Sequence, residues 1–156
     1  MGAGKSTVGR RLSKKLNWTF IDLDEEIERR ERRAIADIFR ENGEPYFRHL
    51  ERLSLQNIST FPKAVVALGG GTFIDTENRA LAEKTDLTVW LKVSFAKVVH
   101  RVRIDGTRPK FTDREQAERL YETRQPFYAL AKVHVSTDDE SPEEVVDQII
   151  EVFGKS

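Results

Sequence analysis

The fold is decided at the start of the chain, where residues 1–11 read MGAGKSTVGRR. Gly2-Ala3-Gly4-Lys5-Ser6-Thr7 matches the second half of the phosphate-binding loop pattern G-x-x-x-x-G-K-[ST]. The first glycine of that pattern, and the hydrophobic strand that comes before it, would precede Met1. Taken alone, the half-motif fits either a nucleotide site or a helix N-terminus with glycines by chance.

The residue types suit phosphate chemistry if the loop is a nucleotide site. Gly2 and Gly4 let the backbone turn its N–H groups toward phosphate oxygens, and the following helix adds its positive N-terminal end. Lys5 would reach the β- and γ-phosphates, and the hydroxyl of Ser6 would be a ligand of Mg²⁺. On this interpretation the loop would bind the phosphates of a nucleotide together with Mg²⁺.

Composition narrows the class of protein. The chain has 156 residues, with 26 Lys and Arg against 26 Asp and Glu, and no cysteine. Zero net charge does not favour a nucleic-acid binder that works through a basic face, and the lack of cysteine removes disulfides and thiolate chemistry. No apolar run approaches the about 18 residues of a membrane span, and no signal peptide is recognisable. We expect a single domain over residues 1–156, cytoplasmic and monomeric, with a small-molecule substrate and no membrane or nucleic-acid partner.

Short apolar runs alternate with longer amphipathic stretches along the chain. This alternation predicts an α/β domain with a parallel sheet. Strands are expected at residues 18–22, 64–68, 87–91 and 133–135. Helices are expected from the glycine loop to residue 15 and at 25–33, 35–41, 45–58, 76–83, 95–103, 114–131 and 142–153.

Two carboxylates, Asp22 and Asp24, stand at the end of the first expected strand. In extended chain this spacing points both side chains to the same side, at the sheet edge where ligands of parallel sheets bind. One would serve Mg²⁺ through water and the other would accept a proton from a substrate hydroxyl. The alternative is that Asp24 only caps a helix beginning at Glu25.

Gly69-Gly70-Gly71 follows the most strand-like run, and three glycines would let a ligand approach the main chain closely. Arg48 and Glu51 are spaced i, i+3 on an expected helix. Taken alone the pair fits an ordinary surface ion pair; its functional interpretation is an arginine held to clamp a substrate carboxylate.

Two further arginines stand beside prolines. Asp105-Gly106-Thr107-Arg108-Pro109 fits a mobile lid whose arginine neutralises phosphate charge. Arg124 lies in a helical pattern that Pro126 is expected to kink, or to end near Gln125, and by itself Arg124 fits a solvated side chain.

The ordered set G-A-G-K-S-T, F-I-D-L-D, I-A-D-I-F with F-R-H-L-E, L-G-G-G, T-R-P and R-Q-P-F-Y resembles the shikimate kinases, from residue 1 to about 142. The resemblance implies a three-layer α/β/α P-loop kinase fold with a central parallel sheet whose first strand is truncated. It also implies transfer of the γ-phosphate of MgATP to the 3-hydroxyl of shikimate, in the route to aromatic amino acids. The resemblance implies, in addition, a mobile substrate-binding segment at about 34–60 and a lid at about 104–114.

The resemblance further implies a role for each matching residue. On the nucleotide side, residues 2–7 hold the phosphates, Lys5 and Arg108 act in catalysis, and Ser6 and Asp22 serve the metal. On the substrate side, Asp24 binds the reacting hydroxyl and is the candidate base. The rest of that side comprises Arg48, Glu51, Gly69, Gly70, Gly71 and Arg124, with the arginines on the carboxylate.

The sequence also departs from the family pattern. Lys110-Phe111 stand where leucines usually follow the lid arginine, and Asp138-Asp139-Glu140 where some members carry an arginine against adenine. If the chain starts at Met1, we expect lower stability and weaker ATP binding. The alternatives are a related small-molecule kinase, such as one for gluconate, and a nucleotide-binding homologue that has lost catalysis.

Overall fold

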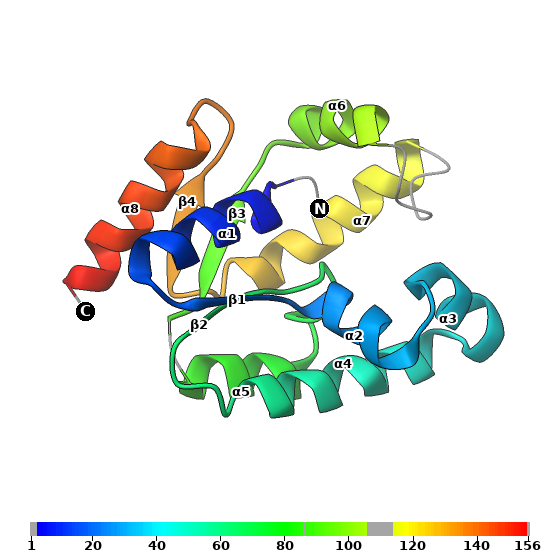
Figure 1. Ribbon diagram of the computed structural model, residues 1–156. Coiled ribbons are helices and arrows are strands. Elements are labelled where there is room, and N and C mark those ends of the chain that lie inside the picture. Colours follow the sequence, from blue (N-terminus) through cyan, green and yellow to red (C-terminus); the bar gives the residue numbers. More distant parts are fainter. Residues whose placement is uncertain (1–2, 86, 106–113, 156) are drawn as a thin grey trace. The chain divides into compact units, whose positions relative to one another are not determined.

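The computed structural model describes residues 3–85, 87–105 and 114–155, which form four strands and eight helices (Figure 1). Parallel strands alternating with helices confirm the expected α/β class. The strands are β1 (Thr19–Asp22), β2 (Ala64–Ala67), β3 (Val89–Lys92) and β4 (Val133–Ser136). The helices are α1 (Lys5–Leu16), α2 (Leu23–Glu31), α3 (Ile35–Asn42), α4 (Glu44–Ile58), α5 (Thr76–Thr85), α6 (Phe95–Asp105), α7 (Arg114–Tyr128) and α8 (Pro142–Gly154).

The chain divides into two compact units, each built on one pair of parallel strands. The N-terminal unit is Gly9–Asp86 and contains β1 and β2. The C-terminal unit combines Met1–Val8 with Leu87–Ser156 and contains β3 and β4. Parallel pairing requires a crossover between the two strands, and α2–α4 supply it in the first unit while α6 and α7 supply it in the second.

The core of the N-terminal unit lies where the crossover helices meet the β1–β2 pair. Its buried members are Leu23 and Ile27 of α2, Ile38 of α3, and Phe47 and Ile58 of α4. The α4 helix runs alongside α2 and α3 at one end and α5 at the other (Figure 1). This packing fixes α4, which carries two of the expected site residues.

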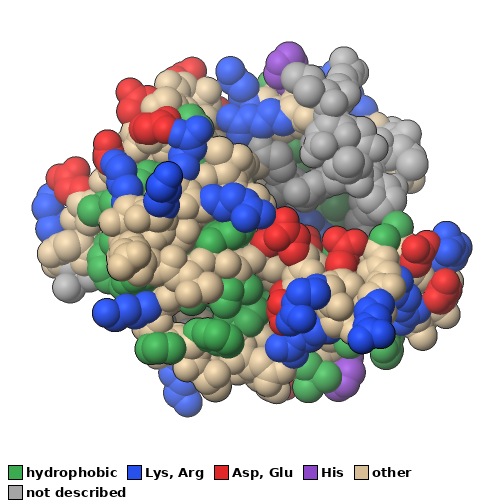
Figure 2. Space-filling view, in the orientation of Figure 1, with side chains coloured by type: hydrophobic (Ala, Val, Ile, Leu, Met, Phe, Trp, Pro, Cys, Tyr) green, Lys and Arg blue, Asp and Glu red, His purple; other side chains and the backbone are tan. Residues whose placement is uncertain are grey.

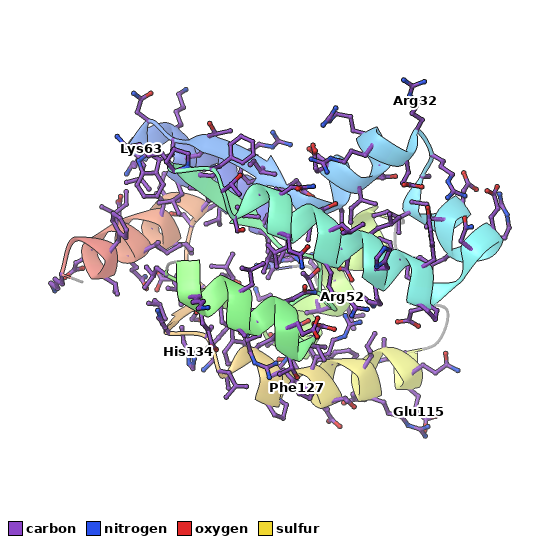
Figure 3. The ribbon with its side chains drawn as sticks, turned by 90° about the horizontal axis from the view of Figure 1, so that it is seen from below. Arg32, Arg52, Lys63, Glu115, Phe127 and His134 are labelled. Carbon is purple, nitrogen blue, oxygen red and sulfur yellow. The ribbon has the colours of Figure 1, made fainter. Side chains whose placement is uncertain are left out.

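The outer faces of the same unit are highly charged. Figure 2 shows acidic and basic side chains intermixed where α2 and α3 lie, and exposed pairs such as Arg29–Glu26 and Arg40–Asp37 account for them. Arg52 extends from α4 toward α5, where its Nη1 lies 3.8 Å from Oε2 of Glu77 (Figure 3). Exposed pairs of this kind add little to stability.

The C-terminal unit buries one face of α8 through Val145, Val146 and Ile149. Val133 and Val135 of β4 are also buried, while His134 and Ser136 between and after them are exposed. Within the described residues no helix is long and apolar enough to cross a membrane.

Pro126 was expected either to kink its helix or to end it near Gln125, and the second alternative is wrong. The helix continues to Tyr128, and the amide of Ala129 still donates to the carbonyl of Gln125 at 3.0 Å. A proline removes its own amide from the hydrogen-bond ladder and crowds the carbonyl four residues earlier, but the residues after it can still donate, as Ala129 does.

A capping box begins α8, and its removal tests how much this helix end contributes. Ser141 Oγ accepts from the amide of Glu144 at 3.2 Å, and Glu144 Oε2 accepts from the amide of Ser141 at 2.6 Å. We expect Ser141→Ala to lower the free energy of unfolding by about 1 kcal/mol in a urea titration. Ser136→Ala, at an exposed position at the end of β4, is the control, and an equal loss in both variants would contradict the capping role.

Candidate active site

The described part of the glycine loop leads directly into α1. Gly4 has a φ of 77°, a left-handed conformation that side chains rarely adopt, and its carbonyl accepts from the amide of Val8 at 2.9 Å. Ala3 is buried against Val93 and Val98 of the C-terminal unit. Lys5, Ser6 and Thr7 therefore form the first turn of a helix whose N-terminus favours anions. Gly2 lies outside the described residues.

Asp22 caps α2. One carboxylate oxygen of Asp22 accepts from the amides of Asp24 at 3.0 Å and Glu25 at 3.2 Å. The alternative in which Asp24 caps a helix starting at Glu25 is wrong, because α2 already begins at Leu23. The cap leaves Asp22 at the carboxyl end of β1, which is the edge expected from the sequence.

Asp24 lies in the first turn of α2 rather than in extended chain, so the strand-spacing argument for placing it beside Asp22 is wrong. It nevertheless faces the glycine triplet. A Cβ added to Gly69 would lie 3.0 Å from Oδ1 of Asp24 and 3.3 Å from Oγ1 of Thr72. Gly69 thus provides the space that the carboxylate of Asp24 occupies next to the main chain.

Arg48 and Glu51 form a partly buried pair and not the surface pair that their spacing alone suggests. Glu51 is 1% exposed, and its Oε1 accepts from Nη1 of Arg48 at 2.5 Å. Its other oxygen, Oε2, accepts from the hydroxyl of Thr72. Arg48 Nη2 also lies 3.1 Å from Oε1 of Glu44, one turn earlier on α4. The guanidinium is therefore held by carboxylates on two sides.

The charge of Arg48 is secured by these neighbours. Burial opposes the charged form of the guanidinium, but the hydrogen bonds and charges of Glu51 and Glu44 outweigh it and raise the pKa of Arg48 above its ordinary value. Arg48 is thus a permanent cation beside the glycine turn, which suits recognition of a carboxylate.

Gly71 lies directly under that cation. A Cβ at Gly71 would lie 2.6 Å from Cζ of Arg48 and closer still to Nη1. The glycine turn therefore brings an acid, Asp24, and a cation, Arg48, against two of its three residues. Gly70, between them, is half-buried.

The remaining expected residues fall elsewhere. Arg124 lies on α7 in the C-terminal unit and is 8% exposed, so the solvated alternative is wrong.

Arg108, most of the expected lid and Lys110-Phe111 lie outside the described residues. Among the described residues, no group of three or more His, Cys, Asp or Glu side chains is arranged to hold a metal ion.

Sequence reasoning missed Thr72 and Glu44. The sequence does contain a pattern that predicts the contact of Glu44, because Glu44 and Arg48 are spaced i, i+4 on a helix. No local pattern predicts the contact of Thr72, since its partner Glu51 lies 21 positions away.

Comparison with known proteins identifies the family. A family model for shikimate kinase matches residues 1–153. The shikimate kinase of Persephonella marina is 39% identical over 151 residues, which cover 96% of this chain and 92% of that protein. The chain belongs to the shikimate kinase family.

Solved structures of shikimate kinases have the same fold. The enzyme of Acinetobacter baumannii in complex with shikimate superposes with a TM-score of 0.93 at 30% identity, covering 99% of this chain and 89% of that one. The Aquifex aeolicus shikimate kinase gives a TM-score of 0.89 at 34% identity, with 99% and 92% covered. These matches confirm the P-loop α/β kinase fold and the resemblance seen in the sequence.

Family membership makes the chain a kinase with ATP as the phosphate donor. It decides against the gluconate kinase alternative, since the family model covers nearly the whole chain.

The contact between Gly71 and Arg48 can be tested in this kinase by a single methyl group. Gly71→Ala would push the guanidinium aside, and because a long side chain can move, we expect a small loss of stability but a rise of roughly tenfold in the KM for shikimate. Gly154→Ala is the matched control, since a Cβ there meets nothing within 4 Å. Steady-state kinetics and thermal melting measure both effects; an unchanged KM in Gly71→Ala would count against a role of the Arg48 position in substrate binding.

Proposed function

We propose that this chain transfers the γ-phosphate of ATP to the 3-hydroxyl of shikimate, with Mg²⁺ as the metal. The observation that carries this proposal is the placement of an acid and a cation on one glycine turn, where Asp24 lies against Gly69 and Arg48 against Gly71. This arrangement suits a substrate that carries both a hydroxyl, which could donate its proton to Asp24, and a carboxylate, which could pair with Arg48.

The chain's residues divide the work of the reaction. Phosphoryl transfer needs mainly positioning and charge stabilisation. Gly2 to Thr7 would hold the phosphates by backbone amides and the α1 N-terminus, with Lys5 on the β- and γ-phosphates. Asp24 would accept the hydroxyl proton, and Arg48 would bind the carboxylate. The resemblance to the family also assigns Arg124 to the carboxylate.

The donor atoms suit a magnesium ion. Mg²⁺ prefers hard oxygen ligands and is usually held by one or two protein groups together with substrate phosphates and water. Ser6 and Asp22 would supply such oxygens, and the ion would neutralise phosphate charge. Arg108 would add a further positive charge from the expected lid.

The proposal also includes the expected mobile segment, localisation and oligomeric state. Residues of about 34–60, which include α3 and α4, would move when substrate binds. The chain would act as a single cytoplasmic domain and as a monomer. The resemblance to shikimate kinases supports these statements.

The first experiment follows ADP release from MgATP with and without shikimate. We expect ADP release that depends on shikimate, because family membership and the charge pair on the glycine turn agree. Gluconate in place of shikimate is the control substrate. ATP binding without any shikimate-dependent release would instead favour the non-catalytic homologue.

Substitutions of the two aspartates separate a catalytic role from a structural one. Asp24→Asn should lower kcat by about 10²- to 10⁴-fold without unfolding the protein, since it removes only the proton acceptor. Asp22→Asn should keep the α2 cap, because asparagine caps as well as aspartate, but should raise the Mg²⁺ concentration needed for half-maximal rate.

Glu25→Gln is the matched control for both variants. Glu25 is an exposed acid in the same turn of α2 and pairs with Arg10 at 3.1 Å. We expect its kcat and its Mg²⁺ dependence to equal those of the unmodified chain. If Asp24→Asn is as active as Glu25→Gln, Asp24 is not the base.

A further inference from the structure

The hydroxyl of Thr72 is joined to the expected substrate-binding arginine through one buried carboxylate. Glu51 offers two oxygens, and each has one donor: Arg48 Nη1 on Oε1 and Thr72 Oγ1 on Oε2. At 1% exposure Glu51 has almost no access to water, so these two donors provide most of the compensation for its buried charge.

Thr72 is the rigid end of this chain of contacts. Its side chain is fully buried, its amide donates to the carbonyl of Gly69 at 3.1 Å, and its own carbonyl accepts from Nδ2 of Asn78 at 3.2 Å. Asn78 is buried in turn, and its amide donates to Oδ1 of Asp75 at 3.0 Å. These contacts hold the main chain of Thr72 in place, and full burial restricts the side chain that carries the hydroxyl.

Arg48 is the movable end. Its side chain is 22% exposed, and apart from Glu51 its charged partner on α4 is Glu44, which is 53% exposed. An exposed pair of this kind is weak in water. The direction of the guanidinium therefore depends mainly on where the carboxylate of Glu51 stands.

We propose that Thr72 is a positioning residue for substrate recognition: by holding Oε2 of Glu51, it sets the direction in which Arg48 presents its guanidinium to the substrate carboxylate. The proposal rests on the proposed function. A glutamate side chain has several rotatable bonds, so a carboxylate fixed at one oxygen only can turn. With both oxygens fixed, the Arg48 guanidinium stays against Gly71, in the same turn whose Gly69 lies next to the carboxylate of Asp24.

Thr72→Val tests this directly, because valine has nearly the same shape and lacks the hydroxyl. We expect the KM for shikimate to rise about tenfold, with the KM for ATP unchanged and kcat reduced less than the KM is raised. Thr72→Ser keeps the hydroxyl and loses a methyl group, so its KM for shikimate should be close to that of the unmodified chain. If Thr72→Val has not stayed folded in thermal melting, Thr72→Ala against Thr72→Ser replaces the comparison.

A substrate without the carboxylate charge separates positioning from general damage. The methyl ester of shikimate cannot pair its carboxyl group with an arginine, so the unmodified chain and Thr72→Val should show the same kcat/KM for the ester. An equal loss for ester and acid would overturn the proposal, because the hydroxyl would then act on the fold and not through Arg48.

The route through Glu51 is checked with a double variant. If Thr72 acts through Glu51, then Thr72→Val should add little to the effect of Glu51→Gln on the KM for shikimate. Fully additive effects would overturn the proposal.

The outcome for this proposal is distinguishable from the outcome for the proposed function. Shikimate-dependent turnover by the unmodified chain with an unchanged Thr72→Val would overturn only the role of Thr72. No such turnover by the unmodified chain would overturn the proposed function and this proposal together.

Discussion

The buried carboxylate of Glu51 is the constraint on which the N-terminal unit's site depends. A charge with 1% exposure is tolerated only where donors surround it, and those donors come from two places in the sequence. Arg48 lies one turn earlier on α4, and Thr72 lies in the turn after β2. Meeting the needs of one side chain therefore ties a helix to the loop that carries the glycine triplet.

The glycines of this turn contribute because they have no side chain. Gly69 and Gly71 leave room for the Asp24 carboxylate and the Arg48 guanidinium to lie against the main chain, and a methyl group at either position would crowd them. Opposite charges therefore lie against two glycines of one turn, which have no side chains to displace them. This is a suitable surface for a small acid that bears hydroxyl groups.

Local structure and chemistry share residues in this protein. Asp22 supplies the α2 cap through one carboxylate oxygen, and it is also the acid expected to serve the metal. The cap holds this side chain at the end of β1 and starts the helix that carries Asp24. A substitution at Asp22 therefore tests the role of this residue in the reaction only if the new side chain still caps α2.

The sequence by itself determined the order of strands and helices, the glycine loop and the family, because apolar periodicity, caps and motif spacing are local properties. It placed Asp24 near the site but at the end of a strand, whereas Asp24 lies in the first turn of α2. Sequence patterns locate the boundary between two elements only to within one or two residues. Only the tertiary structure decided that Glu51 and Arg124 are buried and that Thr72 reaches Glu51. Burial and contacts between distant residues depend on how elements pack, and no spacing within one segment encodes that.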